Sequence, residues 1–289
     1  RSTMSRLRGT LTLAGFAALT LPLMPLQAVF KRVSPRFARS FPHWYHKRVC
    51  KLLGIRINQT GAISTDSPVL IVANHSSWVD IPVISAVAPV SFIAKKEVGG
   101  WPGVSALATL QRTVFVDREK RLSVGKTARE VNERLQSGDN LVLFAEGTST
   151  DGNRVLPFRT SLFAAVKPVR AGGNAKPNPP QSRGSASKAA AHPVVQTLTI
   201  VYTKLHGVPL GRHDRAQVGW YGDMDMISHA WQLLRAGPLD VSIHIGPPIS
   251  LDTFADRKQL AQHTEHEIRE TFLTTLRGTK TTLEQSKTG

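Results

Sequence analysis

The sequence predicts an α/β fold with a mixed, largely parallel sheet flanked by helices, preceded by an N-terminal membrane-associated helical segment. Short apolar runs of strand length alternate with longer stretches of helical spacing, beginning at residues 69–73. Several of these runs stop abruptly at polar turn residues, as strands do when their ends form a ligand site. Residues 9–30 contain no charged side chain and are long enough to cross a bilayer or to lie embedded in one leaflet.

Composition limits the classes of partner. The chain has 289 residues, 41% of them hydrophobic, which suits a globular core of one large domain or two small ones. Lys and Arg number 37 against 20 Asp and Glu, so the net charge of +17 indicates an anionic partner. Nucleic acid, an anionic membrane surface and acidic substrates or carriers all fit that charge. Cys50 is the single cysteine, which excludes intramolecular disulfides and Cys-rich zinc sites and favours a buried structural thiol.

The N-terminal segment, residues 1–40, is predicted to be a membrane anchor. Pro22 and Pro25 are expected to interrupt a straight helix near its end, and basic residues flank the apolar run on both sides. Charge asymmetry therefore sets the orientation poorly, and an interfacial or re-entrant anchor remains an alternative to a full span. A signal peptide fits less well, because no small-x-small cleavage site follows, and a plain core helix is the third alternative.

Residues 41–53 mix aromatic, basic and apolar side chains at helical spacing. Trp44, Tyr45 and Arg48 are residue types that a membrane-surface helix uses, with rings at the headgroup level and cations near phosphates. An ordinary amphipathic helix leading into a strand at residues 55–57 explains the same pattern equally well.

The stretch from Val69 to Val83 carries the first candidate chemistry. A buried strand at residues 69–73 ends at Asn74-His75-Ser76-Ser77. His75 and Asp80 are five residues apart, which on one helix would be about 140° apart. The pair therefore works best with His75 in a loop and Asp80 in the first helical turn, where the carboxylate fixes the imidazole tautomer and leaves the other nitrogen to accept a proton. This spacing also occurs by chance, so it does not establish catalysis alone.

The remaining elements follow in order. The predicted strands are residues 91–94, 114–116, 141–144, 194–202 and 239–245, and the predicted helices are residues 81–90, 122–136 and 254–276. Residues 167–193 form a low-complexity insert of Gly, Pro, Ser, Ala and basic residues, expected to be a loop near the site entrance. Parallel strands ending at His75, Arg118 and Glu146 would bring these side chains to one sheet edge.

Two motifs resemble the glycerolipid, or lysophosphatidic acid type, acyltransferase family. Residues 74–80 read N-H-S-S-W-V-D and residues 144–148 read F-A-E-G-T, similar to the family patterns N-H-x-x-x-x-D and F-P-E-G-T-R. Between them, residues 94–98 and 113–118 look like two further family blocks in the expected order. The resemblance covers residues 69–202 and places the acyltransferase domain at residues 41–289.

The resemblance implies a membrane-associated enzyme that moves a fatty acyl group from acyl carrier protein or coenzyme A to the hydroxyl of a lysophospholipid. It implies His75 as general base, Asp80 as its orienting partner, Glu146, Gly147 and Thr148 as acceptor-binding residues, and Arg118 as the headgroup ligand. A thioester is already activated, so no metal and no further cofactor is implied. The expected location is the cytoplasmic face of a bacterial inner membrane, without a nucleic-acid partner.

The acceptor is where the sequence departs from the family pattern. Ala145 replaces the usual proline, and Ser149 stands where an arginine usually helps to hold a phosphate. Lysophosphatidic acid is the first choice of acceptor by a narrow margin. Residues 220–225, W-Y-G-D-M-D, are similar to a bacterial branch that acylates lyso-ornithine lipid, which is the alternative. The competing class is a non-enzymatic basic protein that binds membrane or nucleic acid through its charge.

Overall fold

The computed structural model describes residues 2–95, 104–116, 121–165 and 192–287. The helices are α1 (Ser2–Val33), α2 (Pro35–Leu53), α3 (Asp80–Val87), α4 (Val104–Leu110), α5 (Arg121–Gln136), α6 (Arg212–Val218), α7 (Met226–Ala236) and α8 (Arg257–Lys287). The strands are β1 (Ile55–Thr60), β2 (Val69–Ala73), β3 (Ser91–Lys95), β4 (Val114–Val116), β5 (Leu141–Phe144), β6 (Val194–Leu205), β7 (Val208–Pro209), β8 (Leu239–Ile245) and β9 (Ile249–Ser250). Two short 3-10 helices cover Leu162–Ala165 and Leu251–Thr253.

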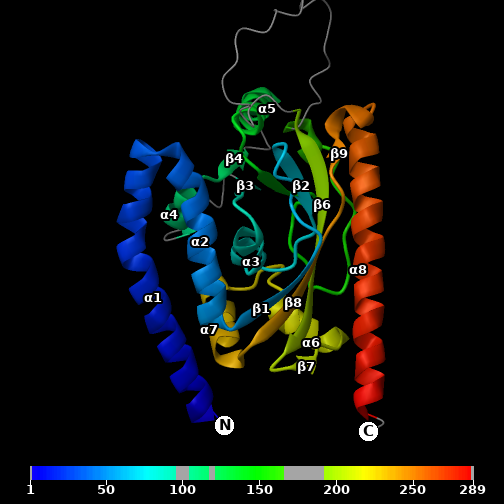
Figure 1. Cartoon of the computed structure of the whole chain (residues 1–289). Coiled ribbons are helices and arrows are strands. Elements are labelled where there is room, and N and C mark those ends of the chain that lie inside the picture. Colours follow the sequence, from blue (N-terminus) through cyan, green and yellow to red (C-terminus); the bar gives the residue numbers. More distant parts are fainter. Residues whose placement is uncertain (1, 96–103, 117–120, 166–191, 288–289) are drawn as a thin grey trace, which may run out of the picture.

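These strands form one mixed sheet with helices on both faces (Figure 1). Its order is β1-β8-β6-β2-β5-β3-β4, and β7 and β9 pair with β6. The pairs from β6 through β2, β5 and β3 to β4 are parallel, whereas β6 pairs antiparallel with β8. The predicted mixed, largely parallel sheet is confirmed. The register pairs Ala73 with Phe144, so the residues that leave β2 and β5 are neighbours at the carboxyl edge.

The sheet separates two hydrophobic cores. All five residues of β2 have no exposed surface, as expected for a strand covered on both faces. One core packs α5 and α8 against the sheet, with Phe272 and Ile268 of α8 buried in it. The other packs α2 and α3 against the opposite face and includes Cys50. Each large apolar side chain buried in this way stabilises the fold by about 1.5–3 kcal/mol.

The first two helices form a hairpin beside the sheet (Figure 1). The expectation that Pro22 and Pro25 interrupt the first helix is wrong, because α1 continues through both prolines to Val33. Each proline removes a backbone donor, but the Gln27 side chain in the next turn donates to the carbonyls of Ala38 and Leu110 and ties α1 to its neighbours. The proposed domain boundary at residue 40 falls inside α2.

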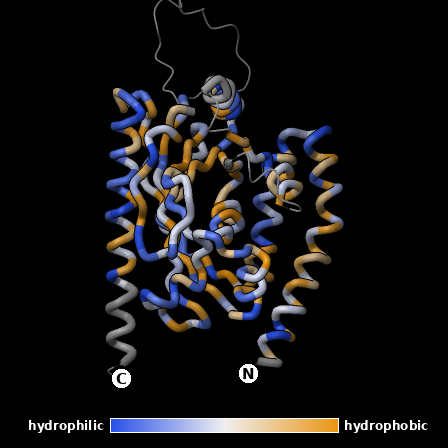
Figure 2. Tube along the Cα trace, turned by 180° about the vertical axis from the view of Figure 1, so that it is seen from behind, coloured by the Kyte–Doolittle hydropathy of each residue, from blue (hydrophilic) through white to orange (hydrophobic). Residues whose placement is uncertain are grey.

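The α1 helix is long and apolar enough to cross a membrane by length and composition. Its candidate span is Met4–Val33, with a mean hydropathy of 1.7, and only 11% of its apolar stretch is buried in the protein. Figure 2 shows hydrophobic residues along α1 and hydrophilic ones at its turn into α2. On α2, Trp44 is 41% exposed and Arg48 lies over its ring at 5.2 Å. The exposed apolar surface of both helices therefore favours association with a membrane.

Asn74 joins the end of β2 to the middle of β6. Its side chain accepts from the Ile200 amide at 2.8 Å and donates to the Ile200 carbonyl at 2.9 Å, and it is 1% exposed. We expect Asn74→Ala to lower the free energy of unfolding by about 2–4 kcal/mol, because two buried backbone groups lose their partner. Denaturant unfolding in a neutral detergent would measure this change.

Asn58→Ala on β1 is the matched control, because Asn58 is exposed. It should change the free energy of unfolding by less than about 0.5 kcal/mol. Equal effects of the two substitutions would show that the Asn74 bridge contributes nothing specific.

Candidate active site

The loop between β2 and α3 places a histidine against a buried carboxylate. His75 Nδ1 lies 2.7 Å from Asp80 Oδ2, and the same oxygen accepts from the backbone amides of Ser76 and Ser77 at 2.7 and 3.0 Å. The predicted contact between loop and first helical turn is thereby confirmed. An ionised carboxylate only accepts hydrogen bonds, so Nδ1 carries the proton and Nε2 keeps its lone pair.

The imidazole is held in one plane by an aromatic neighbour. The His75 ring stacks on Phe144, the last residue of β5, with centroids 4.0 Å apart and an angle of 18° between planes. Phe144 in turn stacks on Phe92 of β3 at 5.9 Å. The His75 side chain is 17% exposed and the Asp80 side chain 0%. Asp80 and the loop residues Ser76 and Ser77 are therefore buried, while the His75 side chain keeps part of its surface exposed.

Tyr202 of β6 is a residue of this site that sequence reasoning missed. Its hydroxyl donates to Asp80 Oδ1, the oxygen that His75 does not use, and the side chain is 4% exposed. Burial first, and then the Asp80 charge, raises the pKa of Tyr202 well above its usual value, so the phenol stays protonated. The sequence showed only a polar ring ending an apolar run, because the pairing of β6 with β2 cannot be read from it.

Glu146, which follows β5, binds the backbone of the loop that carries His75. Its Oε1 accepts from the His75 amide at 2.8 Å and its Oε2 from the Leu156 amide at 2.6 Å, and the residue is 2% exposed. Burial raises its pKa to about 7, although both backbone bonds act to lower it. Both carboxylate oxygens thus bind backbone amides, one of them that of His75, and the role of Glu146 toward the acceptor stays a prediction.

The other predicted ligand residues have different outcomes. Gly147 is buried with φ of 74°, a left-handed conformation that favours glycine, and it shapes the turn after β5. Thr148 is exposed at this turn and stays a predicted acceptor ligand. Arg118 lies outside the described residues, as do residues 166–191 of the predicted insert. Within the described ranges no group of three His, Cys, Asp or Glu side chains could hold a metal.

Residues 220–225 pack directly against this loop. The Trp220 amide donates to the Ser76 carbonyl at 2.8 Å, and the Ser149 hydroxyl donates to the Trp220 carbonyl. Ser149 therefore binds the backbone of this segment, while Thr150 binds the His75 carbonyl through its amide at 3.1 Å. The segment that the sequence associated with the acceptor thus lies beside His75.

An apolar cavity of about 390 Å³ lies between the α1–α2 hairpin and the sheet. Its walls come from α1, α2, α3, β3, α4 and α7, and include Phe16, Leu23, Tyr45, Trp78, Phe92 and Ala230. Trp78 belongs to the loop that carries His75, and Phe92 is linked to His75 through Phe144.

Trp78 is fixed by a buried histidine. Its indole Nε1 donates to His229 Nδ1 of α7 at 3.0 Å. Burial lowers the pKa of His229, which keeps the imidazole neutral and able to accept this bond. Helix α7 thus joins the cavity wall to the loop of His75.

Known proteins match both the sequence and the fold. A model of the family described as Acyltransferase matches residues 54–174. The chain is 42% identical over 272 residues to the lyso-ornithine lipid O-acyltransferase of Brucella abortus, covering 93% of this chain and 95% of that protein. The corresponding enzyme of Rhizobium meliloti is 38% identical over 260 residues, or 90% of this chain and 84% of that one.

Two further matches concern a different acceptor. The 1-acyl-sn-glycerol-3-phosphate acyltransferase of Neisseria gonorrhoeae is 43% identical over 98 residues, which is 34% of this chain and 38% of that protein. The crystal structure of the 1-acyl-sn-glycerophosphate acyltransferase PlsC from Thermotoga maritima has a TM-score of 0.60 and 19% identity, covering 93% of this chain and 97% of that one. At that identity the likeness concerns the fold. The matches over nearly the whole length of both proteins show that the chain belongs to the acyltransferase family.

Proposed function

We propose that this acyltransferase moves a fatty acyl group from a thioester, acyl carrier protein or coenzyme A, to the free hydroxyl of a lyso-lipid, with His75 as general base. The observation that carries the proposal is the His75 geometry, in which Nδ1 is bound to buried Asp80 and Nε2 faces outward. Membership of an enzyme family removes the non-enzymatic basic protein from consideration.

The proposed reaction is a proton transfer to His75 coupled to acyl transfer. Nε2 of His75 removes the proton from the acceptor hydroxyl as its oxygen attacks the thioester carbonyl. The C–S bond then breaks, the new C–O ester bond remains, and the thiolate takes the proton back from the imidazolium. Asp80 stabilises that imidazolium and keeps its ring in place. The apolar cavity under the hairpin offers a dry site of suitable chemistry for a fatty acyl chain.

The acceptor we propose is lyso-ornithine lipid, ahead of lysophosphatidic acid. Relatives named for lyso-ornithine lipid match along nearly the whole chain, whereas the Neisseria phosphate enzyme matches 34% of it. Ser149, where the family pattern has a phosphate-binding arginine, binds the Trp220 backbone. This reverses the narrow order that the sequence alone gave. Lysophosphatidic acid stays the second candidate because the motif region is similar to that of the Neisseria enzyme.

The location we propose is the cytoplasmic face of the inner membrane. The apolar α1 helix, the exposed Trp44 and the net charge of +17 support binding to an anionic bilayer. A bilayer-bound enzyme would meet its lipid acceptor in the membrane and its soluble donor from the cytoplasm.

His75→Ala should lower turnover by about a hundred- to ten-thousandfold, because the acceptor hydroxyl loses its general base. Steady-state acyl transfer and thermal unfolding would be measured together. His263→Ala is the control, since His263 is a half-exposed residue of α8 paired with Glu267. It should leave both quantities unchanged, and a His75 variant with turnover within a few-fold of wild type would refute the assignment.

Tyr202→Phe should move the acid limb of the pH–rate profile to higher pH. Without the phenol donor the Asp80 charge is less dispersed, so it stabilises the protonated, inactive form of the His75 ring more strongly. Two other titratable groups lie near the pair. Burial raises the pKa of Glu146 to about 7, and it raises the pKa of the Cys50 thiol to about 12, which keeps that thiol neutral. A shift of a few tenths of a unit to one unit is expected.

Tyr221→Phe is the matched control, because Tyr221 is exposed. Its profile should coincide with that of wild type. Reduced turnover of Tyr202→Phe on an unshifted acid limb would mean that Tyr202 only packs the core.

Purified enzyme should turn over lyso-ornithine lipid faster than lysophosphatidic acid with the same thioester donor. Ser149→Arg should raise activity on the phosphate acceptor by about one to two decades, the value of one charge-assisted hydrogen bond. Asn58→Arg adds the same charge on exposed β1 and should not change the preference. Turnover on lysophosphatidic acid alone would reverse the proposed order of acceptors.

A further inference from the structure

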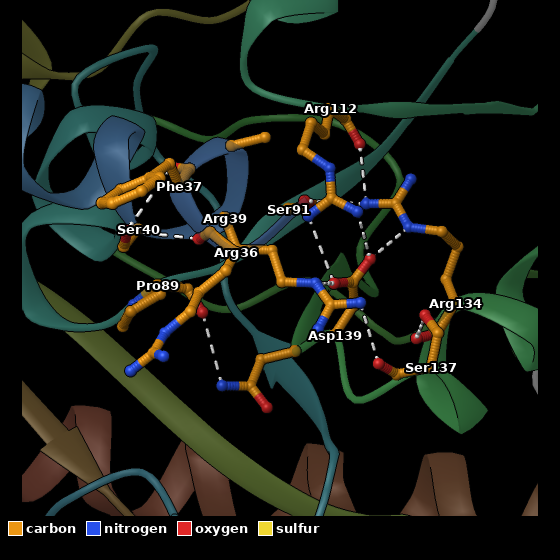
Figure 3. Close-up of polar contacts among 12 residues, drawn as sticks. Arg36, Phe37, Arg39, Ser40, Pro89, Ser91, Arg112, Arg134, Ser137 and Asp139 are labelled. Carbon is orange, nitrogen blue, oxygen red and sulfur yellow. Dashed lines mark hydrogen bonds and ion pairs between the residues drawn. The ribbon is translucent and has the colours of Figure 1, made fainter. Parts of the chain in front are cut away.

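A second charged site lies at the amino ends of the strands, opposite the edge that carries His75. Asp139 lies two residues before β5 and is 4% exposed. Three arginines converge on its carboxylate, Arg39 from α2, Arg112 after α4 and Arg134 from α5 (Figure 3). One negative charge thus faces three positive ones inside a largely buried cluster.

All three arginines are ion-paired with the carboxylate, and two of them also donate hydrogen bonds to it. Arg112 binds it with two nitrogens, at 3.2 and 2.8 Å, and Arg134 Nε donates to Oδ2. Burial acts to raise the pKa of Asp139, but Arg134 and Arg112 outweigh it and hold the pKa below its usual value. Arg39 Nε approaches Oδ1 to 2.7 Å but has no hydrogen bond there. Arg39 is nevertheless ion-paired with Asp139, and its Nη2 donates to the Ser137 carbonyl at 2.8 Å, so one carboxylate is shared by three guanidinium groups.

Lys31 adds a fourth cation. Its ammonium donates to the Thr109 carbonyl at 2.8 Å, and its pKa is lowered by burial and then by Arg112 and Arg134. Arg112 itself takes a left-handed conformation, with φ of 61°, which is unfavourable for a non-glycine residue. The fold therefore holds four cationic side chains close together, although they repel one another and Arg112 has an unfavourable backbone conformation.

This charge borders an open cavity of about 380 Å³. Arg39, Arg112 and Asp139 line it, together with the polar residues Gln59, Ser64, Thr65, Ser91 and Asn140. The Arg39 side chain lines the cavity and is 36% exposed, while its Nε is buried against Asp139 and its Nη2 donates to the Ser137 carbonyl. None of the cavity residues belongs to the His75 loop or to the apolar cavity.

We propose that this cavity is a second binding site, specific for a phosphate group, with Arg39 and Arg112 as its cationic ligands. A planar guanidinium binds two phosphate oxygens through charge-assisted bonds. A phosphate in the cavity would balance the positive charge of the three arginines that the single Asp139 carboxylate leaves unbalanced. Free phosphate and the headgroup of an anionic phospholipid share this chemistry, and the start of α2 next to the apolar α1 brings the site close to the segment proposed to meet the membrane.

The test uses the full chain in neutral detergent. Inorganic phosphate is titrated at constant ionic strength against chloride, and the midpoint of thermal unfolding is followed. The midpoint of the wild type should rise and saturate with phosphate but not with chloride. Arg39→Gln should weaken phosphate binding by about ten- to a hundredfold, because one charge-assisted contact is lost while Arg112 and Arg134 still neutralise Asp139.

Arg56→Gln is the matched control, because it also removes an arginine from an aspartate, Asp240, but on β1 and β8. It should keep the phosphate response. Should Arg39→Gln fail to fold, Arg39→Lys retains the charge without the planar fork and should bind about tenfold more weakly. A wild type without a phosphate-specific rise, or equal losses in the Arg39 and Arg56 variants, would overturn the proposal.

Vesicles separate the two sources of phosphate. Phosphatidylcholine vesicles with and without phosphatidylglycerol are compared, using wild type and Arg39→Gln. If the ligand is a lipid headgroup, phosphatidylglycerol recruits wild type more than the variant and free phosphate competes. If it is free phosphate, the two proteins bind both vesicles equally while the thermal response still distinguishes them.

Discussion

The Asp80 carboxylate is the interaction on which the active edge of this protein depends. It begins α3, accepts two amides of the preceding loop, binds His75 and accepts the Tyr202 hydroxyl. A buried charge is stable only when its oxygens are bound in this way. The same atoms therefore fold the loop and orient the base, so the loop cannot loosen without disturbing the chemistry.

Local patterns predicted the site where its parts are close in sequence. The polar turn after 69–73 and the five-residue spacing gave the contact of His75 with Asp80, because loop and helix lie within one turn of chain. The parallel pairing among β2, β5, β3 and β4 agrees with the largely parallel sheet expected from alternating strands and helices, but their order was not predicted. The bounds of β2, β4, β5 and β8 agree with the predicted ones, since buried strands are short apolar runs between turn residues, whereas β1 and β6 each continue three residues further.

Partners far apart in sequence were not predictable. Tyr202 reaches Asp80 across 122 residues, and nothing in an apolar run says which strand it will pair with. The two amide bonds of Glu146 were not predicted either, because a motif gives the residue type but not the direction of its carboxylate. The predicted interruption of α1 at Pro22 and Pro25 was wrong for a related reason. The contacts that Gln27 makes with α2 and α4, which support α1 beyond the prolines, are distant in sequence.

The α1 helix, proposed as the membrane anchor, also forms part of the interior of the protein. Leu13, Phe16, Thr20, Leu23, Met24 and Gln27 of α1 form one wall of the apolar cavity. The proposed membrane attachment and the proposed acyl-chain cavity therefore depend on the same helix, since removing it would open that cavity to water. A variant shortened to remove α1 would lose one wall of the apolar cavity together with its proposed means of binding the membrane. Another hydrophobic helix could replace α1 only if its side chains also fitted this cavity.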